Sequence, residues 1–189
     1  MPIKIFIDQG HNPTGTFNQG AHVDGIYEQD ITYQVGIYLA QMLNNDPRFQ
    51  ARLSRPAPTS VVGINDATSL AGRVRMANQW PANYFISIHA NSNVNPVING
   101  TEVYIYKYYT QANWLAQHVL NGVVATVGTK DNQVRTNPTL YVLKYTKMPA
   151  ILVELAYLSN PSDREKLVND QYQFAQGIYA GILSYFGFA

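Results

Sequence analysis

Short apolar, β-branched segments alternate along this chain with longer segments that carry apolar residues at helical spacing, and this alternation most constrains the fold. Strands that alternate with helices favour an α/β fold, a mainly parallel sheet covered by helices on both faces. We expect loop at 128–138 and a short strand or turn at 140–143. The predicted strands are 3–7, 49–53, 84–88, 102–106 and 150–153, and the predicted helices are 27–45, 69–80, 111–127, 161–168 and 171–186.

Length and composition narrow the possibilities further. The chain has 189 residues, within the range of roughly 100–200 for one domain, and no repeat or linker divides it, so we predict a single domain over residues 1–189. Charged residues make up 13% and the net charge is +1; without a basic stripe, nucleic-acid or anionic-membrane binding is not expected. The absence of cysteine excludes disulfides and thiolate metal sites.

Two further expectations concern membranes and export. No apolar segment approaches the ~20 residues of a membrane span, so membrane insertion is not expected. The first residues predict a strand and show neither a basic n-region nor a small-residue cleavage site, so no signal peptide is expected in this chain. We also expect a monomer.

Chemically active side chains come shortly after three of the predicted strands. His11 follows the first strand, His89 the third and Glu154 the last. The carboxyl ends of parallel strands meet at one edge of an open sheet, and ligands bind there. We therefore expect these side chains to converge, together with Glu28 from the start of the first helix.

Two imidazoles and two carboxylates are the groups that a hydrolytic zinc site uses. Catalytic zinc is often held by two His and one Glu, with water in the fourth position, and the remaining carboxylate can move a proton. Simpler roles stay open: a histidine in a loop often only hydrogen-bonds, and the helix dipole alone favours Glu28 near an N-terminus. Glu154 is harder to explain this way, because a carboxylate after four apolar residues is costly to bury.

Short motifs occur in a fixed order over nearly the whole chain. They are Ile7–His11, Glu28, Ser54-Arg55, Leu70, Arg73–Asn78, Phe85–Asn91, Gly100–Tyr104, Leu140–Leu143, Met148–Glu154 and Ser159-Asn160. In this order the chain resembles the zinc-dependent N-acetylmuramoyl-L-alanine amidases of the amidase-3 type, found in bacterial autolysins, sporulation and germination enzymes and phage endolysins.

The resemblance implies roles for the four residues. His11, Glu28 and His89 would be ligands of Zn²⁺, and Glu154 would be the catalytic carboxylate. The reaction would be hydrolysis of the amide between N-acetylmuramic acid and L-alanine of the stem peptide. The partner would be peptidoglycan, and the protein would act at the bacterial cell wall. The implied fold is a mixed, mostly parallel sheet of about six strands with helices on both faces, of the zinc-dependent exopeptidase-like or phosphorylase/hydrolase-like type.

Three other residues have two open interpretations each. Asp8 either orients His11 by accepting a hydrogen bond from its second ring nitrogen, or only forms a turn. Asn91 either binds substrate or closes its own loop. Arg73 either supports the site or forms an ion pair on a helix surface.

Three other functions compete with an amidase. A zinc peptidase would use similar ligands but would cut between amino acids, whereas an amidase frees the amino terminus of L-alanine. A wall-binding module without chemistry would be expected to lack one of the four groups, and a purely structural domain would explain neither Glu154 nor His89.

Overall fold

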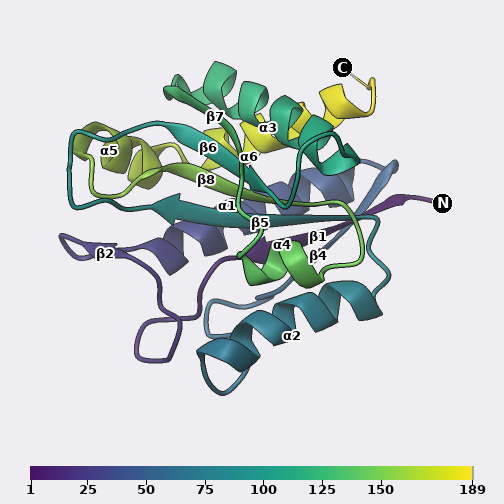
Figure 1. Ribbon diagram of the computed structural model, residues 1–189, viewed down its shortest axis with the longest axis horizontal. Helices are drawn as coiled ribbons and strands as arrows, with labels where there is room; N and C mark the ends of the chain where they lie inside the picture. The colour runs from purple at the N-terminus through teal and green to yellow at the C-terminus, as the bar shows by residue number, and fades with distance from the viewer. Residues whose placement is uncertain (189) are drawn as a thin grey trace.

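Six strands of the computed structural model, which describes residues 1–188, form the central sheet in the order β4-β1-β5-β8-β6-β7 (Figure 1). They are β1 (Ile3–Gln9), β4 (Phe49–Leu53), β5 (Tyr84–Asn91), β6 (Thr101–Ile105), β7 (Asp131–Thr136) and β8 (Ala150–Tyr157). The strands β4, β1, β5 and β8 are parallel, whereas β6 is antiparallel to β8 and parallel to β7. The predicted mixed, mostly parallel sheet is therefore confirmed. A separate small hairpin joins β2 (His22–Val23) to β3 (Ile26–Tyr27).

Helices cover both faces of the sheet, as predicted. In Figure 1, α1, α3 and α6 lie on one face and α2 and α4 on the other. Alternate side chains of β5 serve the two faces: Ile86 and Ile88 pack in the core cluster with α1, α3 and α6, and Phe85 packs in the cluster with α2 and α4. The helices are α1 (Glu28–Asn45), α2 (Asp66–Gln79), α3 (Gln111–Val127), α4 (Tyr141–Tyr145), α5 (Pro161–Asn169) and α6 (Gln171–Tyr185).

Polar capping residues set several helix ends. Asn65 accepts a hydrogen bond from the backbone N–H of Thr68, whose hydroxyl is bonded in return to the Asn65 backbone. This reciprocal cap satisfies N–H groups that would otherwise lack a partner, so α2 begins before the predicted Ser69. Within residues 1–188, no helix has both the length and the apolar character needed to cross a membrane.

Two segments differ from the prediction. Residues 131–136, predicted as loop, form the edge strand β7, in which Val134 is the buried residue. An edge strand of polar residues carries no alternating apolar pattern, so the sequence gives little signal for it. Within residues 140–143, predicted as a strand or turn, Leu140 caps the short helix α4 and residues 141–143 belong to it.

The central strands are also longer than predicted, and this places the active side chains inside the sheet. His89 lies within β5 and Glu154 within β8, and the two are register partners. Glu102 of β6 is the register partner of Glu154 on the other side. Because register partners point to the same face of a sheet, His89, Glu154 and Glu102 form a row across it.

Candidate metal centre

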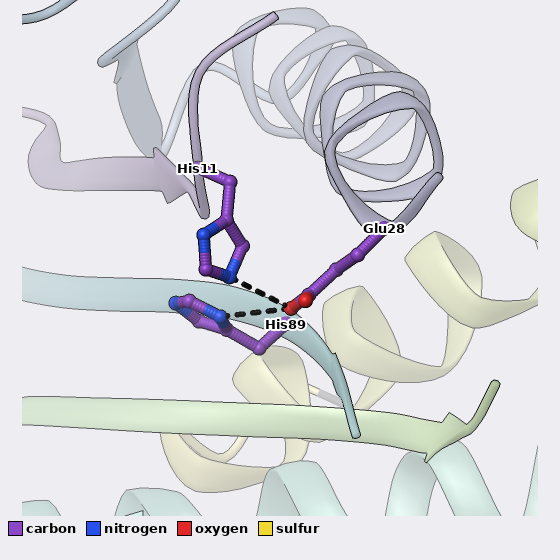
Figure 2. A group of neighbouring side chains, drawn as sticks. All are labelled: His11, Glu28 and His89. Carbon is purple, nitrogen blue, oxygen red and sulfur yellow. Dashed lines mark hydrogen bonds and ion pairs between the residues drawn. The ribbon is translucent and has the colours of Figure 1, made fainter. Parts of the chain in front are cut away.

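His11, Glu28 and His89 converge on one point (Figure 2). The Nε2 atom of His11 lies 3.1 Å from Oε1 of Glu28, and Nδ1 of His89 lies 3.0 Å from the same oxygen. One ligand atom from each residue lies within 4.8 Å of the others. The predicted convergence of these three side chains is what the structure shows. They come from the loop after β1, the first residue of α1 and the interior of β5.

Two buried arginines hold the loop that carries His11. This residue has a φ of 69°, in the left-handed region that residues other than glycine rarely adopt. Its backbone carbonyl accepts hydrogen bonds from Nη2 of Arg73 and Nη1 of Arg55. Both arginines are 1% exposed. The possibility that Arg73 forms a pair on a helix surface is therefore wrong, and its guanidinium fixes the backbone of a candidate ligand.

Two glycines allow the ligand side chains to approach the backbone. A Cβ atom at Gly10 would lie 2.6 Å from Cε1 of His89, and one at Gly20 would lie 2.6 Å from both Glu28 Oε2 and His11 Cδ2. Gly20 also has a φ of 79°, which favours glycine. The three side chains are therefore packed against backbone that carries no side chain of its own.

Backbone amides fix both oxygens of Glu28. Oε1 accepts from the N–H of Ala90 at 3.0 Å, and Oε2 accepts from the N–H of Ala21 at 2.8 Å. Burial alone would raise the pKa of Glu28, but hydrogen bonds and charges from His11 and His89 hold that pKa well below its usual range. For His11 the effects have the opposite sign. Burial alone would lower its pKa, but the hydrogen bond and charge of Glu28 outweigh burial, so the pKa of His11 is raised. Glu28 is therefore an anion that attracts positive charge.

The donor set fits a metal ion. Two imidazole nitrogens and one carboxylate oxygen are the ligands of many catalytic zinc sites, which leave a fourth position open. The second ring nitrogen of His11, Nδ1, lies 3.0 Å from Oδ1 of Asn18, and the Asn18 amide donates to Ser69 at 3.1 Å. Such a contact fixes the ring and its tautomer. Asn18 was not predicted, and nothing in its glycine- and asparagine-rich loop distinguishes it in the sequence.

Asp8 does not contact His11, so the hypothesis that it orients this ring directly is wrong. Its carboxylate is 1% exposed and lies 2.6 Å from Nη1 of Arg73 and 2.8 Å from Oγ of Ser87. Burial raises the pKa of Asp8, but the Arg73 guanidinium outweighs this and the pKa is lowered. Asp8 is linked to His11 through Arg73, because the guanidinium bonds both to the carboxylate and to the His11 carbonyl.

Glu154 lies beside the three converging residues but has a different environment. Among the described residues, its buried Oε2 atom has no hydrogen-bond partner. Burial first, and then the charges of Glu28 and Glu102, raise the pKa of Glu154 well above its ordinary value near 4.5. A carboxylate in this environment binds a proton readily, as a general base and acid must.

Asn91 hydrogen-bonds within the protein. Its Nδ2 donates to Oε1 of Glu102 at 2.7 Å, and its Oδ1 accepts from the N–H of Ser92 at 2.8 Å. These contacts agree with the loop-closing interpretation, and a contact of Asn91 with substrate stays a prediction.

Glu102 is a central residue that the sequence analysis did not single out. It is 1% exposed, and its Oε1 accepts from Tyr104 at 3.0 Å and Tyr157 at 3.1 Å, in addition to Asn91. Its Oε2 lies 3.1 Å from Nε of Arg135. The signal available in the sequence was a carboxylate directly before the apolar and aromatic residues Val103, Tyr104 and Ile105. Such a residue needs partners when it is buried.

A cavity of about 240 Å³ adjoins the candidate metal centre. His11, Asn18 and His89 supply polar atoms to its wall, and Leu70 and Leu140 supply apolar ones. A small ligand group could therefore reach the three converging side chains from this side.

Comparison with known proteins agrees with this geometry. Residues 5–184 match the model of the Amidase_3 family, described as N-acetylmuramoyl-L-alanine amidase. The chain is 35% identical over 188 residues to the N-acetylmuramoyl-L-alanine amidase LytC of Bacillus subtilis (strain 168), a match that covers 96% of this chain and 35% of LytC. It is 32% identical over 180 residues to the amidase CwlM of Bacillus licheniformis, covering 95% of this chain and 65% of CwlM. The chain thus spans about a third of the length of LytC.

The fold has a similar relative among solved structures. The crystal structure of the N-acetylmuramoyl-L-alanine amidase from Clostridium difficile 630 matches with a TM-score of 0.86 and 31% sequence identity, covering 98% of this chain and 97% of that one. Because the family model covers residues 5–184, the chain belongs to the Amidase_3 family, that of the N-acetylmuramoyl-L-alanine amidases.

Proposed function

We propose that this chain is a zinc-dependent peptidoglycan hydrolase that cleaves the amide bond between N-acetylmuramic acid and L-alanine of the stem peptide. The observation that carries the proposal is the arrangement of three converging donor atoms from His11, Glu28 and His89 beside Glu154, the register partner of His89. Family membership supports the same reaction.

Nε2 of His11, Nδ1 of His89 and a carboxylate oxygen of Glu28 would hold the zinc ion. When bound, zinc supplies a Lewis acid for the amide carbonyl and lowers the pKa of a water molecule. Asn18 keeps the His11 ring in place through Nδ1, and the Ala90 N–H keeps Glu28 in place. The protein thereby fixes the donor atoms before substrate arrives, which reduces reorganisation during the reaction.

Glu154 moves the proton. It takes a proton from the attacking water as the new C–O bond forms, and it gives that proton to the L-alanine nitrogen as the C–N bond breaks. Its raised pKa favours holding the proton between the two steps. Its buried oxygen has no donor among residues 1–188, which is consistent with a group that exchanges its proton with substrate.

We further propose that residues 1–189 act as a single catalytic domain, as a monomer, at the bacterial cell wall. Peptidoglycan is the proposed partner, and both autolysins and endolysins fit this activity.

The test combines metal analysis with mass spectrometry of digested peptidoglycan. The parent chain should bind about one zinc ion per molecule through His11, Glu28 and His89, and should release stem peptides with a free L-alanine amino terminus. Glu154→Gln should keep the zinc and lose activity by about 10²- to 10⁴-fold. Glu165→Gln, on the exposed surface of α5, is the matched control and should keep both.

Other outcomes would favour the competing functions. New termini between amino acids would indicate a zinc peptidase. Binding to peptidoglycan without turnover or zinc would indicate a wall-binding module. Full activity of Glu154→Gln would refute the role of Glu154.

A further inference from the structure

A second cleft, with a volume of about 460 Å³, lies at the β7 edge of the sheet. Lys130, Asn132 and Arg135 line one part of it, and Val97 and Ile98 line another. We call it the Arg135 cleft. It combines two cationic side chains with two exposed apolar ones, whereas the cavity beside His11 has neither lysine nor an exposed aliphatic residue in its wall. The two cavities therefore suit different parts of a substrate.

The guanidinium of Arg135 is held from its inner side. Nε lies 3.1 Å from Oε2 of Glu102 and donates to the carbonyl of Asn132 at 3.1 Å. The two terminal nitrogens make no hydrogen bond with any described residue, and the side chain is 51% exposed. A guanidinium held in this way presents a planar pair of donors, the geometry that suits a carboxylate.

Strand register places Arg135 on the same face of the sheet as Glu154. Arg135 is the partner of Tyr104 in β6, and Glu102, two residues earlier in that strand, is the partner of Glu154. Two strand spacings separate β7 from β8, which is about 10 Å, and the Arg135 side chain reaches back along its strand to lie 3.1 Å from Glu102, the register partner of Glu154. An extended peptide advances about 3.3–3.6 Å per residue. A group bound by Arg135 would therefore belong to the second or third residue beyond a bond cleaved at Glu154.

The charge of the cleft is positive on its open side. Glu102 is a nearby anion, but it is buried and surrounded by Asn91, Tyr104 and Tyr157 as well as Arg135. The pairing of β5 with β8 has a register shift next to Tyr157. Such a bulge changes the direction of a side chain, and here the Tyr157 hydroxyl donates to the Glu102 carboxylate. Lys130 and Arg135, in contrast, are both exposed, so their positive charges face the open side of the cleft.

We infer that the Arg135 cleft binds a free carboxylate on the stem peptide, on the residue that follows L-alanine. The inference rests on the proposed function and adds a substrate preference to it. N-acetylated sugars of the glycan are uncharged, so the peptide supplies the anion. Arg135 donates to the carboxylate, and Val97 and Ile98 contact the aliphatic part of the peptide. The preferred substrate carries D-glutamate with its α-carboxylate free, rather than D-isoglutamine, in which that group is an amide.

Binding to Glu154→Gln, which does not turn the substrate over, separates this inference from catalysis. The probes are N-acetylmuramoyl-L-alanyl-D-glutamate and its D-isoglutamine form, both with the γ-carboxyl blocked as a methylamide so that they differ only at the α-carboxyl, and binding is measured by calorimetry. We expect the carboxylate form to bind about tenfold more tightly, which is the size of one charge-assisted hydrogen-bond pair. Adding Arg135→Gln should abolish the preference, and Arg135→Lys should retain part of it. Lys144→Gln, which removes a cation of α4 outside the cleft, should leave the preference intact.

The same substrates tested with the parent chain keep the two proposals distinguishable. Hydrolysis of both forms without a binding preference, or a preference that Arg135→Gln leaves unchanged, would overturn the inference and leave the amidase proposal standing. Absence of measurable binding to either form would also overturn it. A binding preference that depends on Arg135, without hydrolysis by the parent chain, would support the cleft and refute the amidase proposal.

Discussion

Asp8 and Glu154 are carboxylates inside neighbouring parts of the same sheet, but they differ in whether polar groups surround them. Both lie on the face that α2 and α4 partly cover, because Asp8 pairs in register with Ser87 and Ser87 pairs with Leu152, two residues before Glu154. Asp8 has a guanidinium and a hydroxyl as partners, and its pKa is lowered. The buried oxygen of Glu154 has no partner among the described residues, and its pKa is raised.

The difference shows how one sheet face separates structural and reactive roles. Asp8 neutralises Arg73, and Arg73 in turn holds the backbone of His11, so this carboxylate supports the candidate metal centre. Oε2 of Glu154 has no such partner in the part of the chain that the structure describes, which disfavours the charged form of Glu154 and leaves its proton exchangeable. Partners rather than depth in the sheet decide which carboxylate can do chemistry.

The largest expected effect comes from removing the cation that is paired with Asp8. Arg73→Met leaves Asp8 as an unpaired buried charge and should lower the free energy of unfolding by about 3–5 kcal/mol, measured by urea denaturation. The double variant Asp8→Asn/Arg73→Met should recover a substantial part of the loss, because the two residues are coupled. A loss below about 1 kcal/mol, as for an exposed ion pair, would show that the pair does not support the fold.

A second prediction concerns His11, the candidate zinc ligand that Arg73 and Asn18 both contact. Asn18→Ala removes the acceptor at Nδ1 of His11 and should weaken zinc binding about 10- to 100-fold, measured by competition with a chelator. Asn121→Ala, on the exposed side of α3, is the control. Unchanged zinc affinity in the Asn18 variant would mean that Arg73 and Arg55 alone suffice to place His11.

The smallest expected effect is on the pH dependence of stability, measured on protein from which metal has been removed with a chelator. Because the folded-state pKa of Asp8 lies below 3.8, its contribution to stability is present above that pH and is lost as pH falls through the folded-state pKa. Because the folded-state pKa of Glu154 lies above 4.5, its effect has the opposite sign, and stability falls as pH rises from 4.5 towards that pKa.

Glu154→Gln tests this sign. At neutral pH the metal-free variant should be more stable than the parent by about 1 kcal/mol, the lower end of the cost of an unsatisfied buried group. The difference should vanish near pH 4, where the parent Glu154 is protonated in both states. Thermal unfolding at the two pH values measures it, and a variant that is less stable at neutral pH would contradict the comparison.

The sequence predicts the parts of this molecule that carry strong apolar patterns. The strands that place His11, His89 and Glu154, and the helix that begins with Glu28, follow from such patterns. Strand β7 does not, because its buried residue, Val134, stands among polar neighbours. The contact of Arg135 with Glu102 could therefore not be predicted either. The burial of Arg55 and Arg73 also has no sequence signal, since the backbone carbonyls that they bind are common to every residue.

Gly10 and Gly20 have a consequence for anyone who modifies or transplants this site. An alanine scan would treat them as spacers, yet a single methyl group at either position would overlap His89, or His11 and Glu28. Mutational libraries should therefore lose substitutions at these two positions about as completely as those at the histidines. A designer who copies only the three ligands onto another scaffold must copy the two bare backbone positions with them.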